Sequence, residues 1–189
     1  AIPPEEKEKA DLLHKELTEA VAGNDETLME KYFEKGELDE DEIKAGMKKA
    51  MINHDLFPLF CLSAERNMGS GRLMGFIDNV CPSANEMPPQ GSTKGEDIGC
   101  DASKPVCAFV YKAISEPHVG ELSFMKVFSG TLKSGMDLIN ETTGVSEKLN
   151  QLFVMEGNKR NNVSELSAGD IGATLKLKNT HVNNTLHER

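Results

Sequence analysis

A loop of small and polar residues follows an apolar run in the first half of the chain. The run is Phe57–Leu62, and the loop reads Ser-Ala-Glu-Arg-Asn-Met-Gly at Ser63–Gly69. The run is short and bounded by turn signals, which is typical of a buried strand. Loops at the carboxyl ends of such strands often bind nucleotides in α/β proteins. The pattern therefore raises the question of a nucleotide site at Ser63–Gly69.

Three glycines, Gly69, Gly71 and Gly75, invite comparison with a dinucleotide-binding loop. Their spacing is G-x-G-x-x-x-G, whereas the fingerprint is G-x-G-x-x-G followed about 20 residues later by an acidic residue that binds the ribose. The corresponding region, Glu86–Asp97, has the composition of a linker. This disfavours an NAD or NADP site. A small autonomous enzyme that uses Gly69–Gly75 for a nucleotide cofactor is the alternative of another class.

The signatures of a complete GTPase are missing from the sequence. No stretch reads G-x-x-x-x-G-K-[ST], and neither an Asn-Lys-x-Asp guanine motif nor an Asp-x-x-Gly switch precedes the loop. These elements hold the phosphates and magnesium. We therefore expect no cofactor, no catalytic residue and no GTP hydrolysis in these residues alone.

Metal binding and nucleophilic catalysis are also disfavoured. The four cysteines form no C-x-x-C pair, and no histidine lies near them at zinc-ligand spacing. We expect reduced, mostly buried thiols and no metal. The histidines next to turn-like sequence have no serine or cysteine nearby in a nucleophile motif. The four cysteines are Cys61, Cys81, Cys100 and Cys107, and the two histidines are His118 and His181.

The elements that must position the loop are helices before it and a helix after it. Leu13, Leu17, Ala20 and Val21 share one helical face, which ends at Gly23-Asn24. A second helix carries Leu28, Met29, Tyr32 and Phe33 and ends at Gly36, and we expect these stripes to be core. A third begins at Asp39, with Glu42 completing a capping box. The helix after the loop carries Leu73, Phe76, Ile77 and Val80.

The second half of the chain has the pattern of strands separated by turns. We predict strands near 106–115, 121–128, 137–140, 147–155 and 171–177, with turns that include Pro117–Gly120. Spacings near ten residues indicate a small closed barrel, because closure removes exposed edges. The predicted fold is multi-domain α+β: residues 1–84 mostly helical, a linker at 85–104, and an antiparallel β-barrel at 105–189.

Charge restricts the partners. The chain carries a formal charge of −10, and the excess of acid lies in residues 1–100. An acidic surface repels phosphate, so nonspecific binding of nucleic acid is disfavoured and a DNA partner is not expected. Local RNA contacts from the neutral second half remain open. The sequence contains no apolar run approaching 18 residues and no signal peptide, which disfavours membrane insertion and favours a cytoplasmic setting.

Several motifs together resemble one family, the bacterial elongation factor G among the translational GTPases. "SAERNMG" resembles its last guanine-contacting loop, and "LMEKYFEKGELDEDEIKAGMKKA" its helical insertion. "VGELSFMKVFSGTLKSG", "NKR" and "AGDIGA" resemble its second domain. The family commonly reads Ser-Ala-x-Lys-Asn-Lys-Gly, whereas Arg66 and Met68 occupy the lysine positions here. The difference means either that nucleotide binding is altered or that these surface positions have changed without an effect on function.

The resemblance implies that the chain is the end of a GTPase domain with its helical insertion, followed by the barrel domain. Ser63 and Ala64 would contact guanine only in a full-length parent, which would bind GTP and magnesium and promote translocation. The barrel would dock on the other domains of the parent and on small-subunit ribosomal RNA, and Lys159, Arg160 and Lys133 are the candidate RNA contacts. A ribosome-protection or release-factor GTPase shares the barrel and is the near alternative.

Overall fold

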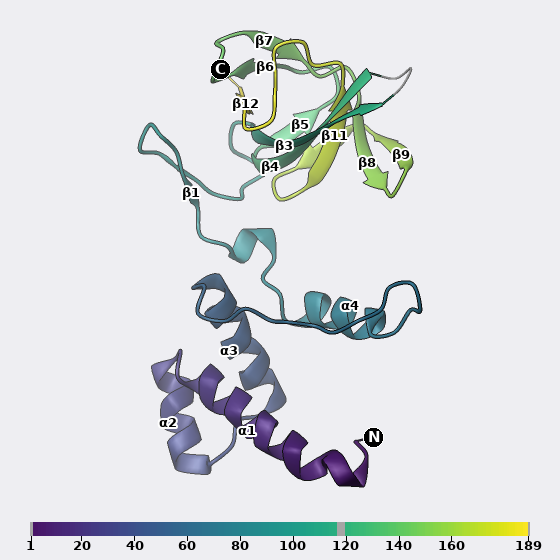
Figure 1. Ribbon diagram of the computed structural model, residues 1–189. Coiled ribbons are helices and arrows are strands. Elements are labelled where there is room, and N and C mark those ends of the chain that lie inside the picture. Colours follow the sequence, from purple (N-terminus) through teal and green to yellow (C-terminus); the bar gives the residue numbers. More distant parts are fainter. Residues whose placement is uncertain (1, 117–119, 189) are drawn as a thin grey trace. The chain divides into compact units, whose positions relative to one another are not determined.

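The computed structural model describes residues 2–116 and 120–188 (Figure 1). It divides into two compact units with the boundary after Ser83. Residues 85–104, which we interpreted as a linker, are grouped with the second unit. His118 and most of the predicted turn at Pro117–Gly120 lie outside the described residues.

The first unit is helical, and its helices begin and end where the sequence signals predict. Asp25 caps the second helix by accepting hydrogen bonds from the Thr27 and Leu28 amides, and Gly36 ends it with a φ of 77°. The predicted capping box between Asp39 and Glu42 is present in both directions. The helices are η1 (Pro4–Glu6), α1 (Lys7–Ala22), α2 (Glu26–Lys35), α3 (Glu40–Ile52) and α4 (Ser70–Asn79).

A close helix crossing holds α1, α2 and α3 together. A Cβ on Gly46 of α3 would lie 2.4 Å from Cγ1 of Val21 and 2.7 Å from Cδ1 of Leu28. Only glycine permits this approach, and a small core forms beside it from Ala22, Leu38, Ile43 and the partly buried Leu28, Met29, Tyr32 and Met47. Lys31–Glu42 and Lys49–Asp25 add ion pairs with N–O distances of 2.5 Å.

Some side chains that we expected in the core are exposed. Leu13 is 53% exposed, Leu17 37% and Phe33 78%. Their periodicity correctly indicates helices, but burial depends on a neighbouring element. Within the described part of the first unit, no element covers these faces. The prediction of core packing is therefore wrong for these three residues.

The predicted buried strand at Phe57–Leu62 is also wrong. The segment is assigned no strand, and Phe57 is 78% exposed and Leu59 93%. A strand needs a neighbour for its backbone hydrogen bonds, and none pairs with this segment within residues 2–116 and 120–188. The segment does contact α4, because the rings of Phe60 and Phe76 pack edge to face with centroids 4.9 Å apart.

The second unit consists mainly of antiparallel strands. Before them come η2 (Ala84–Glu86) and a small hairpin of β1 (Gln90–Gly91) and β2 (Asp97–Ile98). The remaining strands are β3 (Cys107–Glu116), β4 (Gly120–Ser129), β5 (Thr131–Lys133), β6 (Asp137–Asn140), β7 (Ser146–Lys148), β8 (Leu152–Glu156), β9 (Lys159–Val163), β10 (Glu165–Ser167), β11 (Ile171–Leu175) and β12 (Thr185–His187).

Eight of these strands form one sheet in the order β7-β6-β12-β3-β4-β11-β8-β9. The sheet curls because β4 continues through Gly130 into β5, β9 continues into β10, and β5 pairs with β10. Gly130 makes the corner with a φ of 76°, and a Cβ there would lie 2.6 Å from Cα of Val106. The result is the barrel-like fold that the turn spacing predicts.

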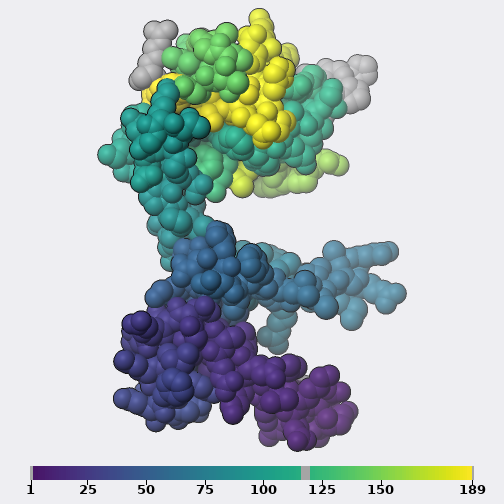
Figure 2. Space-filling model, turned by 60° about the vertical axis from the view of Figure 1, so that its left-hand side comes forward, coloured from purple at the N-terminus to yellow at the C-terminus, as the bar shows by residue number. Residues whose placement is uncertain are grey.

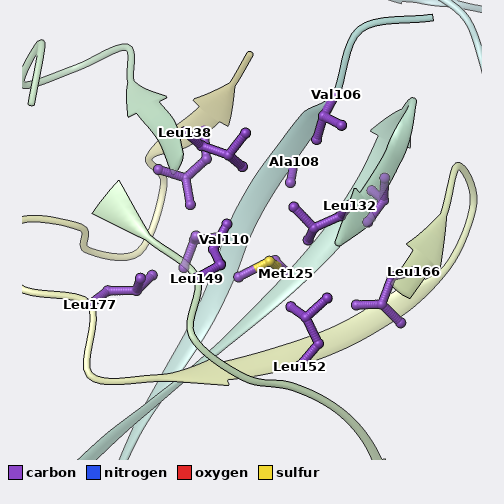
Figure 3. Close-up of a cluster of buried hydrophobic side chains, with 12 residues drawn as sticks. Val106, Ala108, Val110, Met125, Leu132, Leu138, Leu149, Leu152, Leu166 and Leu177 are labelled. Carbon is purple, nitrogen blue, oxygen red and sulfur yellow. The ribbon is translucent and has the colours of Figure 1, made fainter. Parts of the chain in front are cut away.

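A hydrophobic core fills the curled sheet (Figure 3). Val110, Met125 and Leu149 are fully buried and point toward one another from β3, β4 and the turn after β7. On β4 the residues that alternate with Met125 point to the outer side of the sheet, where Leu122, Phe153 and Ala173 form a second, smaller cluster. The fold therefore has a main core inside the barrel and a smaller buried apolar cluster on the other side of the sheet.

A buried polar network ties the connection between β11 and β12 to the sheet. The Asn140 side chain is fully buried, and its amide donates to the Asn179 carbonyl, the Thr180 hydroxyl and the Asn184 side chain at 3.0–3.1 Å. The Glu147 carboxylate accepts from the amides of Lys178 and Asn179. These bonds place β12 between β6 and β3, and Figure 2 shows the yellow C-terminal segment beside the green segments of β6 and β7.

Most of the predicted strands are confirmed, and the differences occur at short elements. The strands near 106–115, 121–128 and 137–140 correspond to β3, β4 and β6, and β11 ends two residues before our prediction. The strand predicted at 147–155 is two strands, because Leu149 leaves the ladder to bond with Gly135 and Met136. We missed β5, β9, β10 and β12 and the hairpin of β1 and β2.

We predict that acid selectively weakens the helical unit. Hydrogen bonding to Lys49 lowers the pKa of Asp25, and hydrogen bonding to Lys31 lowers the pKa of Glu42. Both carboxylates therefore stabilise the fold above their unfolded pKa values, near 4, and this stabilisation is lost as pH falls through the lower folded pKa values. The thermal midpoint of helical circular dichroism should fall between pH 5 and pH 3. In the variant Asp25→Asn/Glu42→Gln, the thermal midpoint at pH 5 should already be lower, and it should change less between pH 5 and pH 3.

The matched control is Glu8→Gln/Glu16→Gln, because both carboxylates are exposed and make no ion pair among the described residues. This variant should keep the acid dependence of the natural sequence. An unchanged acid dependence in the Asp25/Glu42 variant would contradict the assignment.

Candidate functional sites

The Ser63–Gly69 loop is a closed turn that leads directly into α4. Ser63 and Met68 form an antiparallel bridge, with N–O distances of 3.0 and 2.9 Å in the two directions. Inside the bridge the amide of Asn67 donates to the carbonyl of Ala64, with a φ of 51° at Asn67. The loop is therefore ordered by its own backbone, although the segment before it has no strand partner among the described residues.

The turn presents its backbone to solvent. Ser63 is half-buried and Ala64 exposed, and the amides of Ala64, Glu65 and Arg66 have no hydrogen-bond partner within the described residues. Exposed amide donors on a rigid turn can contact the edge of a planar base. Gly71 and Gly75 lie inside α4, so the glycines we compared with a dinucleotide fingerprint do not form one phosphate-binding loop.

The cysteines are free, but our prediction that most are buried is wrong. Cys61 is exposed, Cys81 and Cys100 are half-buried, and Cys107 is buried. Burial raises the pKa of the Cys107 thiol. No group of three or more histidine, cysteine or carboxylate side chains that could hold a metal ion occurs among the described residues.

The three candidate RNA contacts lie on two strands of the second unit. Lys159 and Arg160 begin β9 at its turn with β8, where Lys159 is exposed and Arg160 half-buried. Lys133 is exposed at the end of β5, opposite Glu165. Because Glu165 follows β9, Lys133 lies near the other end of that strand, and the five residues of β9 span about 16 Å. The fold thus brings Lys159 and Arg160 together and separates Lys133 from them.

Two further lysines, which we did not select from the sequence, lie against aromatic rings on the outer side of the sheet. Nζ of Lys112 lies 5.5 Å from the ring centroid of Phe124, and Nζ of Lys126 lies 5.1 Å from that of Phe128. The alternation Phe124-Lys126-Phe128 on β4 was the available signal, because residues two apart share one face of a strand. The bulge that orients Lys112 cannot be recognised from such an alternation in the sequence.

The second unit also contains a cleft of about 810 Å³ between the hairpin of β1 and β2 and the strands β3 and β12. An ion cluster crosses it: Nζ of Lys94 lies 2.7 Å from one Glu141 oxygen, and Nε2 of His187 lies 2.8 Å from the other. Lys94 lowers the pKa of Glu141, and Glu141 in turn raises the pKa of Lys94. The charges of Lys94 and Glu141 neutralise one another, and Nε2 of His187 is buried without a hydrogen-bond partner among the described residues although it lies close to Glu141.

No helix among the described residues is long and apolar enough to cross a bilayer.

Comparison with known proteins connects these features to translation factors. A family model described as elongation factor G domain 2 matches residues 105–189. A crystal structure of a protein from Thermus thermophilus is similar to the whole chain, with a TM-score of 0.77 and 28% sequence identity. The match covers 100% of this chain and 26% of that protein's chain, so the chain spans about a quarter of the relative's length.

We predict that the Ser63–Gly69 turn depends on Gly69. Gly69 has a φ of 81°, and an added Cβ would lie 3.1 Å from Cβ of Leu62. Gly69→Ala should therefore weaken the turn by about 1–2 kcal/mol. The amides of Ser63 and Met68 should exchange hydrogen roughly 5–30 times faster. Gly71→Ala is the control, because nothing lies within 4 Å of its added Cβ, and equal effects of the two variants would refute the role of Gly69.

Proposed function

Residues 105–189 belong to the elongation factor G domain 2 family, and on this premise we propose that the chain joins the end of a GTPase domain to domain 2 of a translational GTPase. The full-length parent would bind GTP and magnesium and act in the cytoplasm on the ribosome during translocation. The fragment itself would be catalytically inactive. A ribosome-protection or release-factor GTPase would share these two parts and remains the alternative parent.

The observation that carries this proposal for the first unit is the exposed apolar segment Phe57–Leu62. Its large side chains and its unpaired backbone are suited to a place inside a sheet. The Ser63–Gly69 turn follows it and leads into α4, which is the strand–loop–helix order of a nucleotide-binding α/β domain. In the parent, the missing strands would cover this segment, and Ser63 and Ala64 would form one wall of the guanine pocket.

For the second unit we propose docking on small-subunit ribosomal RNA and on neighbouring domains of the parent. The barrel is suited to this role by its charge, because residues 101–189 carry as many basic as acidic side chains in a chain of net charge −10. The cations at the turn between β8 and β9, of which Lys159 is exposed and Arg160 half-buried, would reach phosphates without crossing an acidic surface. Lys159 and Arg160 are the leading contacts at this turn, and Lys133 is a separate one.

We predict that the 189-residue chain alone neither hydrolyses GTP nor binds it tightly. The turn offers amides to a base, but these residues include no phosphate cradle, so most of the binding energy would be absent. Isothermal titration with GTP and GDP, with and without magnesium, should give no more than weak binding. Magnesium-dependent binding in the micromolar range would contradict the proposal.

We predict that Lys159→Glu/Arg160→Glu weakens binding of the chain to small ribosomal subunits at low salt. Each lost phosphate contact should lower the slope of log affinity against log salt by about 0.7. Fluorescence anisotropy across a salt series measures both quantities. Lys148→Glu/Lys178→Glu makes the same change of charge at two other exposed lysines of the second unit. If both variants bind like the natural sequence, Lys159 and Arg160 are not contacts.

A further inference from the structure

A bulge in β3 sends Lys112 to the outer side of the sheet. Val110 pairs with Met125, and both side chains are fully buried in the main core. The register then shifts by one residue, so that Lys112 rather than Tyr111 pairs with Phe124. Without this extra residue, Lys112 would have the inward orientation of Ala108 and Val110. Bulges are used in this way to redirect a side chain, often at functional sites.

The redirected lysine joins an alternating pattern of rings and cations. Across the ladder between β3 and β4, Phe109 pairs with Lys126 and Lys112 pairs with Phe124. Each ammonium group lies over a ring, at 5.5 Å for Lys112 and 5.1 Å for Lys126. Diagonal positions in a sheet are about 7–8 Å apart, so the two lysines form a short stripe rather than isolated charges.

Lys112 and Lys126 lack the carboxylate partners that several other lysines have in the described part of the chain. Lys31, Lys44, Lys49 and Lys94 each lie within 2.8 Å of a carboxylate. Among the described residues, neither Lys112 nor Lys126 makes an ion pair with a carboxylate. Lys112 is exposed and Lys126 half-buried, and no described carboxylate neutralises either charge. The rings orient the lysines by cation–π attraction without neutralising them.

An aromatic side chain suitable for base stacking lies beside the stripe. Tyr111 is 40% exposed, and its ring centroid lies 6.3 Å from that of Phe124. A half-exposed aromatic ring next to lysines without carboxylate partners is the arrangement with which proteins bind single-stranded nucleic acid: bases stack on rings and phosphates contact cations. An acidic protein segment would use the lysines but would have less use for the open ring.

We propose that Tyr111, Lys112 and Lys126 form an RNA-binding face on the outer side of β3 and β4, where the lysines contact phosphates and Tyr111 stacks against an unpaired base. The inference rests on the proposed docking of the second unit on ribosomal RNA, and it identifies the surface involved. Arg160 pairs with Met155, whose side chain packs with the outer cluster, so it lies on the same side of the sheet. Three strand spacings, about 14 Å, separate β9 from β4. One RNA segment can therefore span both positions.

The test compares the 189-residue chain with three variants in binding to small ribosomal subunits and to protein-free small-subunit ribosomal RNA. Lys112→Glu/Lys126→Glu should lower affinity on the order of tenfold at low salt and reduce the salt slope by about 1.4. Tyr111→Leu should lower affinity about fivefold or more without changing the slope, because stacking involves no phosphate. Lys112→Arg/Lys126→Arg keeps both charges, so this variant should bind with an affinity within about twofold of that of the natural sequence.

The control is Lys148→Glu/Lys178→Glu, and thermal melting checks that every variant is folded. If the Lys112/Lys126 reversal matches the control while Lys159→Glu/Arg160→Glu weakens binding, the proposed face is wrong and the docking proposal stands. If the unsubstituted chain binds neither intact subunits nor free RNA, the docking proposal itself fails. A third outcome is that the Lys112/Lys126 reversal loses binding to subunits while neither the natural sequence nor any variant binds free RNA. This would identify a ribosomal protein as the partner and overturn the RNA-binding face.

Discussion

Every strand in this chain must find a partner for its backbone, and this requirement explains the difference between the two units. The barrel meets it through one corner: Gly130 turns β4 into β5, and β5 pairs with β10. No other residue fits there, because an added Cβ would lie within 2.8 Å of three backbone atoms of the neighbouring segment. The backbone of Phe57–Leu62 has no partner strand among the described residues. Its apolar side chains are therefore exposed, whereas the barrel core is closed.

Signals that act locally allowed much of this fold to be predicted from the sequence. The capping box at Asp39 and the glycine stop at Gly36 depend only on nearby backbone groups, and both are present. Burial could not be predicted as well. Leu13 and Phe33 lie in correctly predicted helices, and the run at Phe57 is apolar, but exposure depends on which elements lie beside these residues. The short strands β5, β10 and β12 were missed for a related reason, since three residues are too few to show alternation.

The candidate sites show the same limit. Ser63 and Ala64 were found because a family motif marks them, and the structure shows how the Ser63–Met68 bridge shapes their turn. Lys159 and Arg160 were found as adjacent cations in a polar segment. Lys112 was missed because its orientation depends on the bulge at Tyr111, which changes the side of the sheet on which each following residue lies. A pattern of period two cannot reveal where that period is interrupted.

The position of β12 has a consequence for biosynthesis. This strand lies between β6 and β3, although it comes last in the barrel sequence. During translation, β3 and β6 must leave the exit tunnel with one edge unpaired and wait for Thr185–His187 to emerge. At about 5–20 residues per second, the roughly 45 residues between β6 and β12 take some seconds to make. Nascent chains are thus exposed to edge-to-edge association during this interval, and a chaperone that shields strand edges would act then.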